Sequence, residues 1–81
     1  MQNSHNAVLR TIVDNTGMRR VLIIRRSDGL FRFEVEHWSD EPKELCWIPR
    51  GGRSVSLCDS EEIALREAIG RVDWLQELLG A

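Results

Sequence analysis

The chain has 81 residues, enough for one small domain, and its composition of 42% hydrophobic and 30% charged residues is that of an ordinary globular chain. Its formal net charge of −2 differs in sign from the basic charge typical of nucleic-acid-binding domains. No apolar stretch approaches the ~18 residues that a membrane span needs, and the N-terminus lacks the pattern of a secretory signal. These features predict a cytoplasmic protein in which residues 1–81 form a single domain.

The N-terminal part of the chain is predicted to form a strand over residues 7–13. This segment, AVLRTIV, is rich in β-branched residues, and the DNTG sequence that follows is rich in turn formers. A short helix over the same residues is the alternative. Residues 1–6 carry no periodic pattern, and we expect them to be flexible.

Two β-rich runs, RRVLIIRR and FRFEVEHW, flank Asp28-Gly29 and predict a β-hairpin. Asp-Gly suits a two-residue type I′ turn, which would set Ile24 opposite Phe33 and Arg25 opposite Arg32. Because side chains alternate between the faces of a strand, this register predicts a core face made of Leu22, Ile24, Phe31, Phe33 and Val35.

The opposite face of this predicted hairpin carries arginines and a tryptophan. It would hold Val21 and Ile23 as well, which indicates that something partly covers it. Arg19 is expected to lie over Trp38 as a cation–π contact. Arginines and an aromatic group on one sheet face also make it a candidate nucleic-acid surface, carrying Arg19, Arg25 and Arg32.

Residues 45–58, LCWIPRGGRSVSLC, contain both cysteines and a Gly-Gly pair between two arginines. Gly51-Gly52 favours a second two-residue turn, with Arg50 opposite Arg53 and Leu45 opposite Cys58, although a looser connection is the alternative. The segment lacks the patterns of phosphate-binding loops. Two arginines beside the turn still make it a candidate anion site.

The C-terminal segment 59–79 is predicted to be one helix that ends at Gly80. Asp59 is the expected N-cap, because Glu62 three residues later completes a capping box. The core-facing stripe is expected to consist of Leu65, Ala68, Ile69, Val72, Leu75 and Leu79. Three residues unusual for a solvated surface lie on the face opposite the stripe: Ile63, Gly70 and Trp74.

Together these elements predict an α+β fold, an antiparallel β-meander of three to five strands over residues 7–58 with one C-terminal helix packed on one face. In shape this layout, with tryptophans beside the strands, resembles the MbtH-like accessory proteins that bind adenylation domains. The Ser-Leu-Trp-Pro and Trp-Arg-Pro segments of that family have no counterpart here. The resemblance therefore implies only that a chain of this size can act as a partner protein.

No pattern in the sequence indicates catalysis, a metal or a cofactor. Cys46 and Cys58 are too far apart for the close ligand pairs of structural zinc sites, and two free thiols are expected. A nucleophilic cysteine assisted by His37 has no local signature to support it. We therefore expect a protein that is not an enzyme and has no cofactor.

The excess of apolar groups outside the predicted core favours a non-enzymatic protein–protein interaction module, most directly one that self-associates as a homodimer. The expected interaction residues are Trp38, Trp47, Ile63, Gly70 and Trp74. The alternative is a nucleic-acid or anion-binding module that uses Arg19, Arg25, Arg32, Arg50 and Arg53. No membrane partner is expected.

Overall fold

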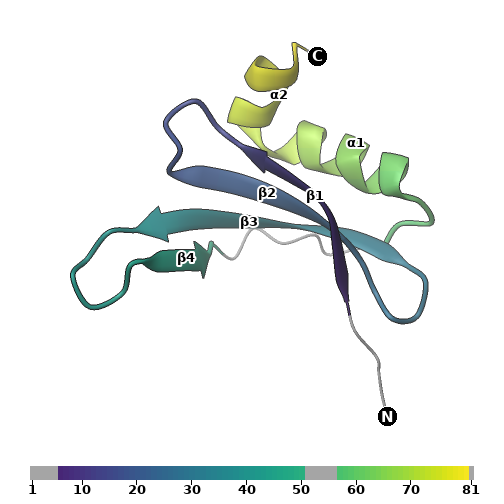
Figure 1. Ribbon diagram of the computed structural model, residues 1–81. Helices are drawn as coiled ribbons and strands as arrows, with labels where there is room; N and C mark the ends of the chain where they lie inside the picture. The colour runs from purple at the N-terminus through teal and green to yellow at the C-terminus, as the bar shows by residue number, and fades with distance from the viewer. Residues whose placement is uncertain (1–5, 51–56, 81) are drawn as a thin grey trace.

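The computed structural model describes residues 6–50 and 57–80. Four antiparallel strands form one sheet in the order β1-β2-β3-β4, and two helices follow and lie on one side of it (Figure 1). The elements are β1 Ala7–Val13, β2 Arg19–Arg25, β3 Phe31–Ser39, β4 Cys46–Pro49, α1 Glu61–Arg71 and α2 Asp73–Leu79. The predicted α+β class and the predicted first strand are confirmed.

The core lies between the sheet and the helices. α1 packs over β2 and β3, and its two buried residues in the core, Ala64 and Ala68, are small enough to let the helix approach the strands closely. Against them pack Val21, Ile23 and Phe33, which are all completely buried. α2 has no close backbone contact with the sheet, and it reaches the core through the buried side chain of Leu75.

The register of the β2–β3 hairpin differs by one residue from the predicted register. The loop contains three residues, 27–29, rather than two: Arg26 N donates to Leu30 O at 2.7 Å, and Gly29 takes a positive φ of 87°. Ile23 therefore lies opposite Phe33. Since a slip of one residue reverses the faces of a strand, Val21 and Ile23 enter the core, and the predicted core positions Leu22 and Ile24 lie on the other side of the sheet.

The N-cap of the C-terminal helical segment lies one residue later than predicted, and the segment is broken in two. The N-cap is Ser60, whose hydroxyl accepts from Ile63 N at 3.2 Å, so the predicted cap at Asp59 is wrong. The chain breaks at Val72, where φ is −115° and ψ is 105°. Val72 is β-branched and buried in the core, and its extended backbone separates α1 from α2. The helical segment ends at Gly80, with φ 69°, as predicted.

The outer edge of β3 is paired at both of its ends. Cys46 of β4 lies opposite Ser39, whereas Cys58 forms an isolated bridge with Phe31. Phe31 and Ser39 are the first and last residues of β3, so at ~3.3 Å per residue the two sites are about 25 Å apart. The predicted pairing of Leu45 with Cys58 is therefore wrong. The Gly51-Gly52 turn itself lies outside the described residues.

Candidate functional site

The arginines expected to share one face of the sheet are divided between its two faces. Arg19 and Arg25 lie on the helix side, because they share a face of β2 with the core residues Val21 and Ile23. Arg32 lies on the other side, where it pairs with Glu34. This separation follows directly from the corrected register.

The structure describes one of the two arginines of the predicted Gly-Gly turn. Arg50 is exposed, and its backbone N–H donates to Val35 O at 2.9 Å, beside β3. Arg53 lies outside the described residues. Binding of nucleic acid or an anion by this set of arginines stays a prediction.

Two of the expected interaction residues, Trp38 and Trp47, pack against each other on the face of the sheet away from the helices. Their rings meet edge to face, with centres 5.6 Å apart. The guanidinium carbon of Arg20 lies 4.2 Å from the centre of the Trp47 ring, and Arg20 also pairs with Glu36 at 2.7 Å. The predicted contact of Arg19 with Trp38 is wrong, since Arg19 lies on the helix side of the sheet, where its guanidinium is beside Trp74. Trp38, Trp47 and Arg20 therefore find their packing and charge partners within one chain.

The other three expected interaction residues do not form one patch. Ile63 is 40% exposed on α1, and Gly70 is exposed with no heavy atom near the position of an added Cβ among the described residues. The close approach expected at Gly70 is therefore not seen within the chain. Trp74 is half-buried, because it packs against the core.

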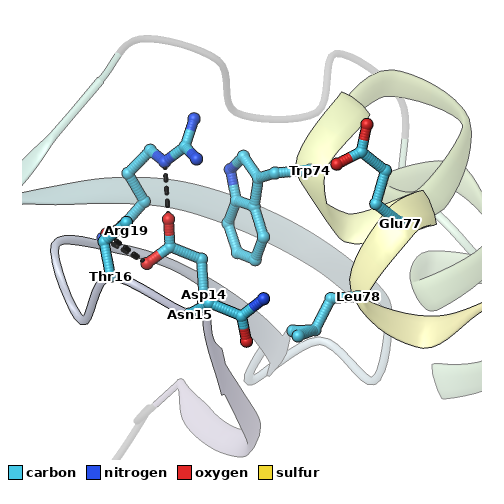
Figure 2. A pocket seen from close by; sticks show the side chains of 7 residues that line it. All are labelled: Asp14, Asn15, Thr16, Arg19, Trp74, Glu77 and Leu78. Atoms are coloured by element: carbon cyan, nitrogen blue, oxygen red, sulfur yellow. Dashed lines mark hydrogen bonds and ion pairs between the residues drawn. The ribbon is translucent and has the colours of Figure 1, made fainter.

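A pocket of about 270 Å³ lies between the β1–β2 turn and α2 (Figure 2). The most buried of its lining residues is Asp14, whose side chain is 4% exposed. Asp14 Oδ1 accepts from Thr16 Oγ1 at 2.8 Å and Gly17 N at 3.0 Å, and Oδ2 accepts from Arg19 Nε at 2.7 Å. The pocket is lined by Asp14, Asn15, Thr16, Arg19, Trp74, Glu77 and Leu78.

The electrostatics of the turn fix the position of Arg19. Burial raises the pKa of Asp14, but the hydrogen bonds from Arg19 and Thr16 and the charge of Arg19 outweigh it and lower the pKa to about 2. Asp14 is therefore ionised at neutral pH and holds Arg19 by its Nε. The guanidinium carbon of Arg19 lies 5.5 Å from the centre of the Trp74 ring.

A second charged group, Glu77, lines the same pocket from α2. In Figure 2 the Trp74 ring lies between Arg19 and Glu77. Within the described part of the chain, no cationic side chain pairs with Glu77, and the terminal nitrogens of Arg19 make no hydrogen bond. Besides the carboxylate of the Asp14–Arg19 pair, the pocket thus presents a second carboxylate, Glu77, and the Trp74 ring lies between Arg19 and Glu77.

Among the described residues, four exposed large apolar side chains lie on β1 and the turn after it, and the others, Leu45, Leu57, Ile63 and Leu79, lie elsewhere along the chain. The exposed fractions are 55% for Val8, 38% for Leu9, 43% for Val13 and 39% for Met18. A register shift between Val8 and Arg10 marks a bulge, which puts Val8 on the same face as Val13. β1 is an edge strand of the sheet that the structure describes.

The two cysteines differ in environment. Cys46 is exposed, whereas Cys58 is buried, and burial together with the nearby charges of Glu67 and Asp59 raises the pKa of the Cys58 thiol. Among residues 6–50 and 57–80, no group of three or more His, Cys, Asp or Glu side chains is placed to hold a metal ion. No helix in the same ranges is both long and apolar enough to cross a membrane.

Comparison with models of protein families, with curated proteins and with solved structures finds no match for this chain. Its function is therefore inferred from its own residues and their geometry.

Proposed function

We propose that this protein is a non-enzymatic self-associating module in which two copies join along β1. The observation that carries the proposal is the outer edge of this strand, which no other strand of the described residues pairs with. β1 is seven residues long and contains no proline, and Val8, Leu9 and Val13 on it are exposed. Long apolar edge strands of this kind are templates for pairing with another strand. The interface proposed here is β1, rather than the residues expected from the sequence, which are Trp38, Trp47, Ile63, Gly70 and Trp74.

A second copy of the chain is the occupant that fits this edge best. An antiparallel strand is complementary to its own copy, because each contributes the same alternation of N–H and C=O groups. Antiparallel pairing about a two-fold axis would place Val8 and Val13 of both copies on the same face of one continuous sheet. Such an interface is closed, since it consumes the β1 edge of both copies.

The charges of β1 are compatible with this pairing. Arg10 is the only charged residue in the strand, and its Nε lies 3.1 Å from Glu61 Oε2 at the start of α1. Each copy therefore neutralises its own arginine. Two β1 strands can approach without opposing unpaired charges, which would otherwise destabilise the pair.

Sedimentation equilibrium of the wild type and of a Val8→Lys/Val13→Lys double variant tests the proposal. The wild type is expected to be a dimer at micromolar concentration. The double variant is expected to raise the dissociation constant at least about tenfold, because four lysines would meet at one interface. Both side chains are exposed in the single chain, so folding is expected to persist.

Leu79→Lys is the matched control, because Leu79 is 45% exposed on α2, away from β1. This variant is expected to dimerise as the wild type does. A wild type that stays monomeric at about 100 μM would exclude self-association. A dimer weakened by Leu79→Lys but not by the lysines on β1 would exclude this interface.

A further inference from the structure

We propose that the pocket between the β1–β2 turn and α2 binds a small zwitterion, a molecule that carries one carboxylate and one ammonium group at the ends of a short carbon chain, as an ω-amino acid does. The carboxylate would bind Arg19, the ammonium group would bind Glu77, and the carbon chain between them would lie against Trp74 (Figure 2). This site is separate from the β1 interface and does not depend on dimer formation.

Arg19 is prepared to bind a carboxylate. Its Nε donates to Asp14 Oδ2 at 2.7 Å, which holds the planar guanidinium in one orientation. The two terminal nitrogens carry the remaining N–H donors, and the side chain is half-exposed. A guanidinium with two donors available binds a carboxylate with two parallel hydrogen bonds. The rotational freedom that such a contact usually removes is already restricted by Asp14.

Because Glu77 lines the same pocket as Arg19, a simple anion would pair with only one of the two charged groups. The charges of Asp14 and Arg19 cancel, so the exposed Glu77 carboxylate leaves the pocket with a net negative charge. A ligand with only a carboxylate would meet this charge, and a ligand with only an ammonium group would leave Arg19 without an anion. A zwitterion satisfies both groups at once.

The size and lining of the pocket also limit the ligand. A volume of about 270 Å³ is just below the usual range for sites that hold drug-sized molecules. Trp74 and Leu78 supply the apolar surface. The site therefore suits a short aliphatic chain between the two charges. Because Arg19 and Glu77 are solvent-exposed, water screens both contacts, and we expect dissociation constants in the millimolar range.

NMR titration of the full chain tests this inference with ω-amino acids from glycine to 6-aminohexanoate, and with hexanoate and hexylamine as probes of a single charge. The Trp74 indole N–H signal reports on the pocket, and the Trp38 and Trp47 signals are internal controls. At least one ω-amino acid is expected to bind about tenfold more tightly than either single-charge probe, because it makes one more charged hydrogen bond with the pocket than the probe does.

Glu77→Gln removes the negative charge that would bind the ammonium group and leaves Arg19 and the turn unchanged, because Glu77 is exposed and pairs with no cation in the described ranges. This variant is expected to reduce zwitterion binding about tenfold without weakening hexanoate. Arg19→Gln is expected to abolish both. The matched controls are Glu62→Gln and Arg25→Gln, two exposed residues outside the pocket.

The inference is overturned if every ω-amino acid binds no better than hexanoate, or if none moves the Trp74 signal at about 10 mM. It is equally overturned if Glu77→Gln and Glu62→Gln have the same effect on zwitterion binding.

Discussion

The Asp14 carboxylate stabilises the β1–β2 turn, and Asp14→Asn removes its charge while keeping one oxygen. The amide oxygen can still accept from Thr16 and Gly17, whereas the ion pair with Arg19 is lost. The pKa of Asp14 is lowered from 3.8 to about 2, and at ~1.4 kcal/mol per unit this corresponds to roughly 2–3 kcal/mol. Because Arg19 is half-exposed, solvent screens part of the pair. We expect the free energy of unfolding to fall by about 1–2 kcal/mol at neutral pH.

The effect of Asp14→Asn is expected to depend on pH. Since the pKa is lower in the folded chain, the stabilisation is fully present above the unfolded value near 3.8 and is lost as the pH falls through about 2. Urea denaturation followed by tryptophan fluorescence at a series of pH values measures this. The difference between wild type and variant is expected to be constant above about pH 5 and to shrink towards zero near pH 2.

Asp28→Asn is the control for a surface ion pair. Asp28 lies in the other hairpin loop, its side chain is 44% exposed, and it pairs with Arg26 at 3.0 Å. Its loss is expected to cost no more than about 0.5 kcal/mol. The reasoning about Asp14 is refuted if Asp14→Asn costs no more than Asp28→Asn, or if its cost is the same at pH 7 as near pH 2.

Three further predictions test the fold. Gly29→Ala is expected to lower the free energy of unfolding by about 1 kcal/mol, because the φ of Gly29 is positive. Gly70→Ala should raise the free energy of unfolding by about 0.5–1 kcal/mol, because Gly70 lies in a helix with open space at the position of an added Cβ. Urea denaturation that gives the same sign for both variants would contradict these expectations. Ser60→Ala should cost about 1 kcal/mol through the lost N-cap, and unchanged stability in the same assay would show that another residue caps α1. Cys46 should react with a thiol reagent at least about tenfold faster than Cys58, as followed by mass spectrometry, and equal rates would mean that Cys58 is not buried.

Local patterns predict much of this fold. The first strand, the hairpin between residues 19 and 38 and the end of the helical segment at Gly80 each depend on a few neighbouring residues, and all are present. β-branched runs, turn formers and a terminal glycine act through the backbone conformation of their own segment. The elements that they form can therefore be predicted without knowledge of the tertiary contacts.

The register of the central hairpin could not be predicted from the turn alone. Asp-Gly suits a two-residue loop, but its glycine equally serves a three-residue loop with a positive φ at the third position. One signal favoured the longer loop: the predicted register opposes Arg25 to Arg32, whereas the observed register separates them and buries Val21 and Ile23. The like-charge pair was evidence against the shorter loop.

The pocket combines residues that the sequence indicates only one at a time. The sequence predicts Arg19 on a sheet face, Trp74 on an exposed helix face and Asp14 in a turn. Their contact depends on the break at Val72, which directs α2 towards the β1–β2 turn. Such a break follows from core packing around Val72, and helical periodicity does not reveal it.

Hydrogen exchange of the β1 amides as a function of protein concentration tests the proposed association most directly. β1 amides that point away from β2 are expected to become more protected as the concentration rises and the dimer forms, while those of α2 do not change. Protection that stays constant in β1 while sedimentation reports a dimer would contradict pairing along this strand.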